Sequence, residues 1–158
     1  MNIVLSGPSG SGKGTITEVL MKDRGYQKFT TCTTRKPREH KKNGFDYYFL
    51  TLDKFLEYLN NGLMHNVREY GGNYYGSFEK DIDNINASVP TIFQLTPDRA
   101  IEMKKHNPDT LLVLVLPPNV DELKNRRNDR SIKRIEDDIK NLKDAKSYDY
   151  VLINDDLN

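Results

Sequence analysis

A glycine-rich loop near the N-terminus carries the clearest chemical signal in the sequence. Residues 7–15 read GPSGSGKGT, so Lys13 completes a G-x-x-x-x-G-K spacing. Glycine lets backbone N–H groups approach phosphate oxygens closely, and the lysine adds a positive charge for the terminal phosphates. We therefore expect a triphosphate to bind at Gly7, Pro8, Ser9, Gly10, Ser11, Gly12, Lys13, Gly14 and Thr15.

Residue 14 departs from the usual form of such a loop. Gly14 stands where Ser or Thr usually follows the lysine, which displaces the magnesium-binding hydroxyl to Thr15. Catalysis by a loop of this kind consists of positioning and charge neutralisation. We therefore expect a nucleoside triphosphate with Mg²⁺ as the donor, Thr15 as the metal ligand, and further cationic side chains at the same phosphates.

A basic segment and an aromatic turn could supply a second phosphate site. Residues 33–38 read TTRKPR, which places Arg35 and Arg38 three residues apart around a proline. Guanidinium groups bond phosphate oxygens two at a time, so this spacing suits one phosphate group. Residues 72–77 read GNYYGS and offer phenol and serine hydroxyls beside a flexible turn. Taken alone, each segment is more typical of an ordinary solvated loop.

Alternating apolar runs and helical patterns predict the elements that must position these loops. Apolar runs near residues 3, 92, 113 and 151 are separated by helical spacing, which is typical of parallel strands buried on both faces. Residues 28–75 break this rhythm with short strands, turns and many aromatic residues, as an antiparallel insertion would. Those rings could form a small core or line a binding face, and the sequence leaves both open.

Two local predictions concern the neighbourhood of the loops. Apolar spacing predicts a helix from Thr15 to Arg24, and Gly25 is placed to close it in the left-handed conformation. Residues 28–32 are predicted to form a single strand that leads into the basic segment.

Together these motifs resemble guanylate kinase. In chain order they read GPSGSGKGT, TTRKPR, NGFDYYF, GGNYYGS, LPPNVDELKNR and VLINDD, and they cover nearly the whole chain. The resemblance implies the α/β, P-loop NTPase three-layer fold, with a central parallel sheet, a mixed α/β nucleotide-monophosphate-binding insertion and a short helical lid. It implies one domain over 1–158, with its core at 1–32 and 78–158, its lid near 124–135 and its monophosphate-binding subregion at 33–77.

The resemblance also implies a role for particular residues at the acceptor nucleotide. It puts the acceptor phosphate on two arginines and two tyrosines, and two hydroxyl side chains beside the guanine. In order, these six residues are Arg35, Arg38, Tyr47, Tyr75, Thr31 and Ser77.

At the donor nucleotide, the resemblance assigns arginines of the lid and its hinge to the donor and transferred phosphates. It also places Asn154 near the donor adenine. Judged on spacing alone, such late arginines are more typical of salt bridges along charged helices. The catalytic residues that the resemblance implies are Lys13, Arg35, Arg126, Arg130 and Arg134.

Guanine is ordinarily recognised in this family by carboxylates, and this chain departs from that pattern. Counting back without a gap from residues 72–77 places the first such position on Asn66, and the second falls on Thr96, two residues before Asp98. A third acidic position aligns with Lys41. Losing a charged acceptor costs about 1.5–3 kcal/mol. We therefore expect Asn66 and Thr96 to lie at the acceptor base and to discriminate between bases less strongly.

Two further departures concern the donor side. Gln94 stands where the family has an acidic residue, which is expected to loosen the positioning of magnesium. The lid is short, because Arg130 is followed almost directly by Arg134. A shorter lid is expected to exclude water less completely from the phosphates.

Composition narrows the classes of function. Lys and Arg total 24 against 23 Asp and Glu, so nothing in the overall charge indicates a nucleic-acid or membrane partner. The single cysteine, Cys32, excludes an internal disulfide framework and suits a reducing cytosol. The sequence shows no signal peptide and no apolar run long enough to span a membrane. We therefore expect a cytoplasmic location, and the oligomeric state stays open.

These observations lead to one expected activity and two alternatives. The expected activity is transfer of the γ-phosphoryl group of ATP to a nucleoside 5′-monophosphate, and the expected acceptor is GMP or dGMP. A different or broader set of acceptors is the first alternative, because Asn66 and Thr96 can donate as well as accept hydrogen bonds. A non-catalytic binding module built on the same fold is the second.

Overall fold

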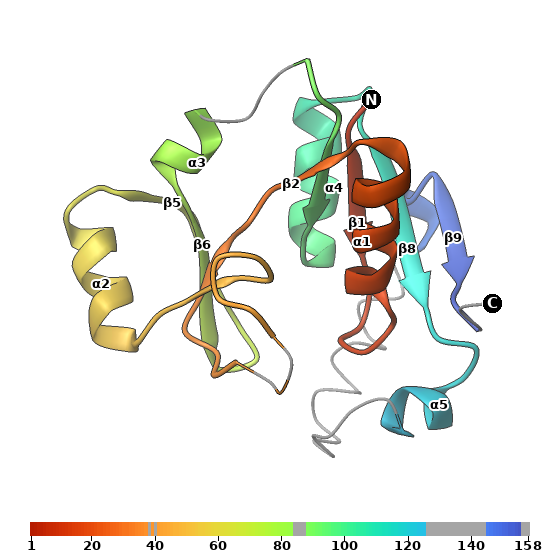
Figure 1. The fold of residues 1–158 in the computed structure, drawn as a ribbon, viewed down its shortest axis with the longest axis horizontal. Helices are drawn as coiled ribbons and strands as arrows, with labels where there is room; N and C mark the ends of the chain where they lie inside the picture. The colour runs from red at the N-terminus through yellow and green to blue at the C-terminus, as the bar shows by residue number, and fades with distance from the viewer. Residues whose placement is uncertain (38, 40, 84–87, 126–144, 156–158) are drawn as a thin grey trace. The chain divides into compact units, whose positions relative to one another are not determined.

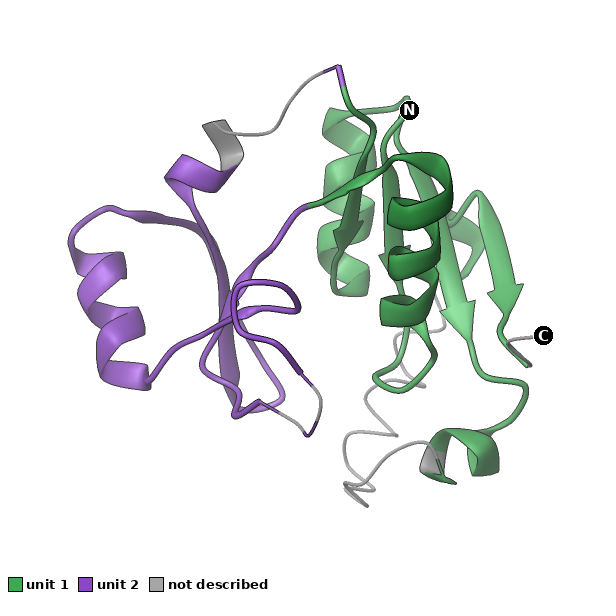
Figure 2. Ribbon diagram, in the orientation of Figure 1, with its two compact units in different colours: residues 1–28, 89–158 green, residues 29–88 purple. Residues whose placement is uncertain are grey.

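The computed structural model describes residues 1–37, 39, 41–83, 88–125 and 145–155 (Figure 1). These residues form two compact units (Figure 2). Unit 1 combines Met1–Lys28 with Val89–Asn158, and unit 2 is Phe29–Ser88. The part expected to form the lid lies almost wholly outside the described residues.

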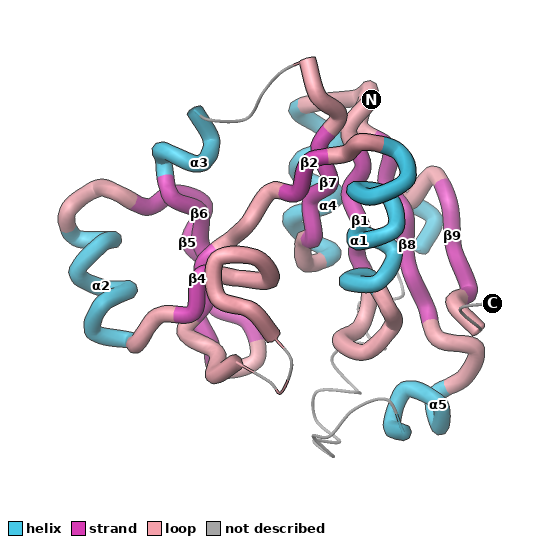
Figure 3. The backbone as a smooth tube through the Cα atoms, in the orientation of Figure 1, coloured by secondary structure: helices cyan, strands magenta, loops and turns pink. Residues whose placement is uncertain are grey.

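Unit 1 contains a five-stranded sheet in which every neighbouring pair of strands is parallel. The strands are drawn in magenta in Figure 3. The parallel strands predicted near residues 3, 92, 113 and 151 are therefore confirmed, and so is the α/β fold class. In spatial order the strands are β2 (Gln27–Lys28), β7 (Thr91–Gln94), β1 (Ile3–Ser6), β8 (Leu111–Leu116) and β9 (Tyr150–Ile153).

Both faces of the central strands of this sheet are buried. Ile3, Leu5 and Val115 form an apolar cluster together with side chains of helix α1 (Lys13–Arg24). Val4 and Leu112 lie at alternating positions and are also fully buried. Helix α4 (Pro97–His106) packs against β1 and β8, and helix α5 (Val120–Asn125) follows β8.

Helix α1 begins earlier than the apolar spacing predicts and ends where it predicts. It begins at Lys13 instead of Thr15, because the loop backbone turns directly into the helix after Gly12. It ends at Arg24, and Gly25 has a φ of 68°, which confirms the predicted left-handed cap. A helix therefore starts at the lysine of the glycine-rich loop.

Unit 2 contains a second, four-stranded sheet. Its order is β4 (Tyr48–Phe49), β3 (Cys32–Thr33), β6 (Asn73–Phe78) and β5 (Met64–Tyr70). The prediction of antiparallel pairing is confirmed for β3, β6 and β5, but β3 and β4 pair in parallel. The loop 34–47 is long enough to return the chain to the end at which β3 began, as a parallel pair requires.

The predicted single strand at 28–32 is wrong. Its first part belongs to β2 in unit 1 and its last residue to β3 in unit 2. The side chain of Gln27 donates to Thr91 Oγ1 at 2.9 Å and to the carbonyl oxygen of Val89 at 3.0 Å, which fixes β2 to β7. The chain then leaves one sheet and enters the other, a step that local sequence does not signal.

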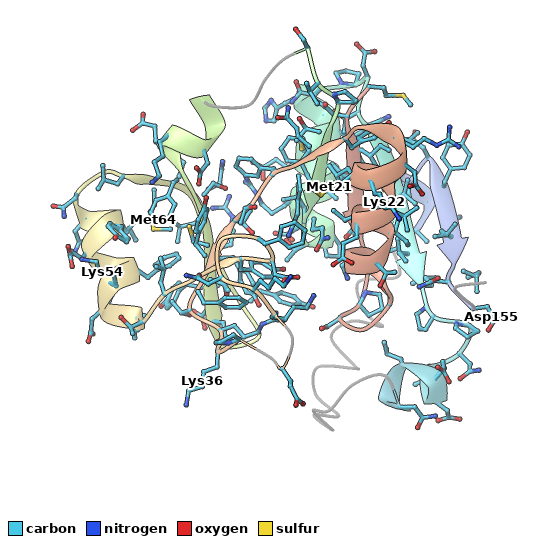
Figure 4. All side chains as sticks on the ribbon, in the orientation of Figure 1. Met21, Lys22, Lys36, Lys54, Met64 and Asp155 are labelled. Atoms are coloured by element: carbon cyan, nitrogen blue, oxygen red, sulfur yellow. The ribbon has the colours of Figure 1, made fainter. Side chains whose placement is uncertain are left out.

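The aromatic residues of unit 2 are divided between its core and the opposite face of its sheet. Phe55 of helix α2 (Leu52–Asn60) is fully buried and forms an apolar core with Cys32 and Met64. Met64 is labelled in Figure 4. Around this core pack the rings of Tyr48, Tyr58, Tyr74 and Phe78. Helix α3 (Glu79–Asp83) follows β6 directly.

Candidate functional site

The glycine-rich loop joins β1 to α1 and adopts a backbone that only glycine tolerates easily. Gly7, Gly10 and Gly12 have φ values of 130°, 91° and 93°. A Cβ at Gly7 would also overlap the backbone carbonyl of Val115 on β8, and one at Gly12 would overlap the side chain of Asn154. At Gly7, both the conformation and the rigid backbone of Val115 therefore require glycine. At Gly12 the conformation favours glycine, and a Cβ would displace the Asn154 side chain.

The ammonium group of Lys13 lies over the loop. Its Nζ donates to the carbonyl oxygens of Gly7 and Pro8, each at 2.8 Å, and lies 3.5 Å from Ser11 Oγ. The positive charge is thereby held beside the start of α1, where the partial positive charge of the helix also favours an anion. This is the arrangement expected of a loop that binds a triphosphate.

Asn154 supports the loop from the end of β9. Its side-chain amide donates to the carbonyl oxygen of Ser11 at 2.9 Å, and its backbone N–H donates to Leu116 at 2.7 Å. The resemblance implies that Asn154 lies near the adenine. In the structure, its amide contacts the loop that is expected to hold the phosphates.

Gln94 and Thr17 anchor the first turns of α1, and the sequence analysis did not identify this anchor. Gln94 Nε2 donates to Thr17 Oγ1 at 2.7 Å and to the carbonyl oxygen of Lys13 at 3.4 Å. Thr17 Oγ1 in turn donates to the same carbonyl at 2.8 Å. Thr17 is buried although α1 is largely polar, and the local sequence does not signal this burial. Thr15 lies in the same first turns of the helix.

Thr96 precedes helix α4 in unit 1, and its hydroxyl is already engaged. Thr96 Oγ1 donates to Asp98 Oδ1 at 2.5 Å. Its side chain makes no capping hydrogen bond to α4. Thr96, which is expected to face the acceptor base, therefore has its hydroxyl hydrogen-bonded to the Asp98 carboxylate.

In unit 2, one face of the sheet brings together several residues expected at the acceptor phosphate. Tyr75 lies directly opposite Thr33, and the ring of Tyr47 lies 6.2 Å from that of Tyr75 and 5.8 Å from that of Phe49. The Arg35 guanidinium carbon lies 5.4 Å from the centre of the Tyr47 ring. We call this surface, made of Arg35, Tyr47, Phe49, Tyr75 and Ser77, the acceptor face.

Arg35 carries a buried donor that lacks a partner. Its Nε atom is buried and makes no hydrogen bond to the part of the chain that the structure describes. The neighbouring Lys36 is exposed and points into solvent (Figure 4). A buried guanidinium N–H without an acceptor is costly, and an anion bound at this place would remove that cost.

Two threonines hold Arg35 in place, and sequence reasoning did not assign them this role. Thr33 Oγ1 donates to the carbonyl oxygen of Tyr74 at 3.0 Å and accepts from the backbone N–H of Arg35 at 3.2 Å. Thr34 Oγ1 accepts from the backbone N–H of Tyr74 at 2.9 Å. The start of the basic segment is thereby tied to β6.

The remaining expected residues of unit 2 have varied surroundings. The carbonyl oxygen of Thr31 accepts from the backbone N–H of Tyr48 at 2.9 Å. Lys41, at the third acidic position of the family, makes an ion pair with Asp46 at 2.6 Å. Asn66 is exposed and has a φ of 58°. Arg38, Arg126, Arg130 and Arg134 lie outside the described residues.

The surroundings of Cys32 make its thiol a poor nucleophile. Burial and, to a smaller extent, the Asp81 carboxylate raise the pKa of the Cys32 thiol to about 12. The thiolate that a nucleophile requires is therefore scarce at neutral pH.

Comparisons with known proteins agree with this geometry. The guanylate kinase family model matches residues 1–158. A guanylate kinase of Clostridium acetobutylicum is 35% identical, over 97% of this chain and 77% of that protein. One of Listeria monocytogenes serotype 4b (strain F2365) is 36% identical, over 97% and 80%. The chain belongs to the guanylate kinase family.

A solved structure supports the same assignment. The crystal structure of guanylate kinase from Anaplasma phagocytophilum matches with a TM-score of 0.76 and 28% identity, covering 99% of this chain and 77% of that one. The phosphate loop and the acceptor face described above are thus parts of a guanylate kinase fold. Within the described ranges, no helix is long and apolar enough to cross a membrane, and no three His, Cys, Asp or Glu side chains gather as metal ligands.

Proposed function

We propose that this chain transfers the γ-phosphoryl group of ATP to GMP, giving ADP and GDP. An oxygen of the GMP phosphate forms a bond to the γ-phosphorus, and the bond from that phosphorus to the β–γ bridging oxygen breaks. The observation that carries the proposal is the complete phosphate loop, with Lys13 Nζ bonded to two of its carbonyl oxygens at 2.8 Å. Family membership names GMP as the acceptor.

On the donor side, the loop and α1 supply charge and direction. Backbone N–H groups of the glycine-rich loop bond the β- and γ-phosphate oxygens, and Lys13 exchanges its carbonyl acceptors for them. Negative charge spreads over the transferred group as the bond to ADP breaks, so a fixed cation lowers the barrier. Arg126, Arg130 and Arg134 are proposed to add charge to the same group, and Asn154 to lie at the adenine.

On the acceptor side, Arg35 is proposed to bind the GMP phosphate. Its buried Nε without an acceptor is the support for this assignment, because a phosphate oxygen would complete it. The Tyr47 and Tyr75 hydroxyls, with Arg38, are proposed to bond the other phosphate oxygens. Thr31 and Ser77 are assigned to the guanine.

Magnesium is the cofactor that this donor requires, and the residues present fit it. Mg²⁺ in phosphoryl-transfer sites is held by phosphate oxygens, water and few protein oxygens. Thr15, in the first turns of α1, supplies one hydroxyl of that kind. Gln94 is neutral and its amide nitrogen is bonded to α1, so it adds no charge there. When bound, the ion would neutralise negative charge on the phosphate oxygens of the donor.

We also propose a cytoplasmic location. The buried, free Cys32 suits a reducing compartment, and the proposed nucleotide substrates are found in the cytosol.

A coupled assay of ADP formation tests the proposed function. The assay uses ATP, Mg²⁺ and each of GMP, dGMP, AMP, UMP and dTMP in turn, with Lys13→Met as the matched inactive variant. We expect ADP release to depend on GMP or dGMP and to disappear in the variant. ADP release that is equal with and without every monophosphate would contradict the proposal.

A further inference from the structure

An irregularity in the β5–β6 hairpin changes which residue lies opposite Ser77. The pairing runs from Tyr70 with Asn73 to Arg68 with Tyr75, and it resumes with His65 opposite Ser77. Two residues of β5, Asn66 and Val67, therefore face the single residue Gly76 of β6. This is a β-bulge, and the φ of 58° at Asn66 belongs to it.

The bulge shifts the register by one residue. An uninterrupted ladder continuing from Arg68 and Tyr75 would pair residue 67 with residue 76, and Asn66 with Ser77. In the structure, His65 occupies the position opposite Ser77 instead. Counting along the sequence without a gap, as the family comparison of Asn66 does, cannot reveal this shift.

The packing of neighbouring residues shows which face His65 occupies. A Cβ at Gly76 would lie 3.1 Å from Met64 and 3.2 Å from Val67, so both of those side chains are on the core side. Residues directly opposite each other in an antiparallel pair share a face. His65 therefore lies with Ser77 on the acceptor face.

Glu79 adds a carboxylate beside His65. Glu79 follows Ser77 by two residues, and its Oε1 lies 3.5 Å from His65 Nε2. A carboxylate at that nitrogen favours the tautomer with the proton on Nε2 and leaves Nδ1 as a hydrogen-bond acceptor. The pair thus offers a hydrogen-bond acceptor opposite Ser77, a position that His65 occupies and Asn66 does not.

The length of β6 places this acceptor at the base end of a bound monophosphate. Arg35, Tyr47 and Tyr75 are the proposed phosphate contacts, and Ser77 lies two residues further along β6, roughly 6–7 Å away. A nucleotide whose phosphate lies at Tyr75 can therefore extend its base toward Ser77 and His65. Guanine presents two neighbouring donors on its pairing edge, N1–H and the 2-amino group. Adenine has no 2-amino group, and its N1 is an acceptor.

We infer that His65, held by Glu79, accepts a hydrogen bond from the base of the acceptor nucleotide and is the specificity determinant on β5 in place of Asn66. This inference rests on the proposed function, because it takes GMP as the ligand of the acceptor face. It assigns Asn66 a conformational role in the bulge.

Calorimetric titration with GMP, IMP and AMP, alongside ATP, tests the inference. The variants are His65→Ala, Asn66→Gly and Glu69→Gln. Glu69 lies opposite Tyr74, a core-side ring, so it is a matched polar control on the other face of the same strand. Glycine tolerates the positive φ at position 66, so Asn66→Gly removes only the side chain.

We expect His65→Ala to weaken GMP binding about tenfold, from the loss of one hydrogen bond of about 1.5 kcal/mol. Its affinity for AMP and ATP should stay within about twofold, so the GMP-to-AMP preference falls. Asn66→Gly and Glu69→Gln should bind all four nucleotides like the wild type. Thermal unfolding of each variant separates a binding effect from a folding effect.

Two results would overturn the inference. One is unchanged GMP binding in His65→Ala, and the other is loss of GMP preference in Asn66→Gly with His65 intact. Binding and turnover are measured separately, so failure of the inference can be distinguished from failure of the proposed function. A wild type that binds GMP without making GDP contradicts the proposed function and leaves the His65 inference standing. A wild type that does not bind GMP overturns both.

Discussion

At the residue scale, the two cations central to the account differ in how their charges are satisfied. Lys13 Nζ is bonded to carbonyl oxygens of its own loop, whereas Arg35 Nε is buried without an acceptor within the described residues. The first group can exchange acceptors when phosphate binds. Arg35 Nε gains an acceptor that it otherwise lacks when a phosphate binds. Removing the Arg35 side chain should therefore mainly weaken the binding of that phosphate.

Replacing Lys13 with methionine should reduce phosphoryl transfer by about 10³-fold or more, because the charge that follows the transferred group is lost. Methionine keeps the length of the side chain, so the fold should persist. Turnover by the coupled assay and the affinity for GMP by calorimetry are the measurements. Turnover within tenfold of the wild type, with unchanged thermal stability, would remove the catalytic role of Lys13.

Replacing Arg35 with alanine should weaken GMP binding about tenfold or more and leave ATP binding nearly unchanged. Only the acceptor phosphate loses a charge-assisted bond. Lys36→Ala is the matched control, because this neighbour removes a positive charge that is exposed to solvent. If Arg35→Ala weakened both nucleotides equally, Arg35 would act through the fold or the donor instead.

At the element scale, Gly7 in the phosphate loop and Gly25 at the end of α1 differ in how closely other elements approach them. Gly7 and Gly25 both have positive φ values, 130° and 68°. A Cβ at Gly7 would meet the rigid backbone of β8, while one at Gly25 would meet nothing within 4 Å. Alanine substitutions at Gly25 and Gly7 therefore distinguish the cost of a positive φ alone from that cost plus a steric overlap with β8.

We expect Gly25→Ala to lower the free energy of unfolding by about 1–2 kcal/mol, the cost of a left-handed alanine. Gly7→Ala should cost about 3 kcal/mol or more, and it should also abolish ATP binding. Chemical denaturation of both variants checks this order. Equal losses would mean that the loop moves away from β8 without penalty.

Asp149 joins the start of β9 to β8 and α4. Its Oδ2 accepts from the backbone N–H of Leu112 at 2.8 Å and from Lys104 Nζ at 2.9 Å. These bonds, the backbone bond first, lower the pKa of the Asp149 carboxyl group in the folded state. Since the folded pKa is lower than the unfolded one, the stabilisation is complete above the unfolded pKa and disappears as pH falls through the folded value.

Asp149→Asn should therefore lower the free energy of unfolding by about 1 kcal/mol at neutral pH, a small value because the pair is about one-third exposed. The difference from the wild type should shrink as pH falls below the ordinary pKa of an aspartate, about 3.9. Thermal unfolding across this range is the measurement. A difference that stays constant with pH would show that the charge of Asp149 is not the cause.

The sequence predicts elements well where the signal is local. The apolar runs that become β1, β7, β8 and β9 show the pattern of buried parallel strands, and Gly25 marks the end of α1. It fails where pairing depends on distant residues. The parallel pairing of β3 with β4 depends on the path of the loop between them. The bulge at Asn66 depends on how β5 and β6 pair across their hairpin, which an ungapped count along the sequence does not show.

Within the site, residue type and spacing predict the phosphate loop, because its chemistry is contained in consecutive residues. The supports of the site are less visible in the sequence. Thr33, Thr34 and Gln94 are ordinary polar residues whose partners become known only when β6 and α1 are placed beside them. Sequence therefore identifies charged groups more readily than the side chains that orient them.

At the scale of the whole molecule, each unit has its own sheet and apolar cluster. The phosphate loop belongs to unit 1 and the acceptor face to unit 2. Substitutions in the phosphate loop should accordingly alter ATP binding and those in the acceptor face GMP binding, whereas turnover requires both nucleotides. Product formation therefore tests the whole account, while separate titrations test its parts.

The most direct test is to incubate the wild-type chain with ATP, GMP and Mg²⁺ and to separate the nucleotides by chromatography. The account predicts GDP and ADP in equal amounts, and neither product from Lys13→Met. ADP without GDP, or no reaction by a folded protein that binds both nucleotides, would contradict it.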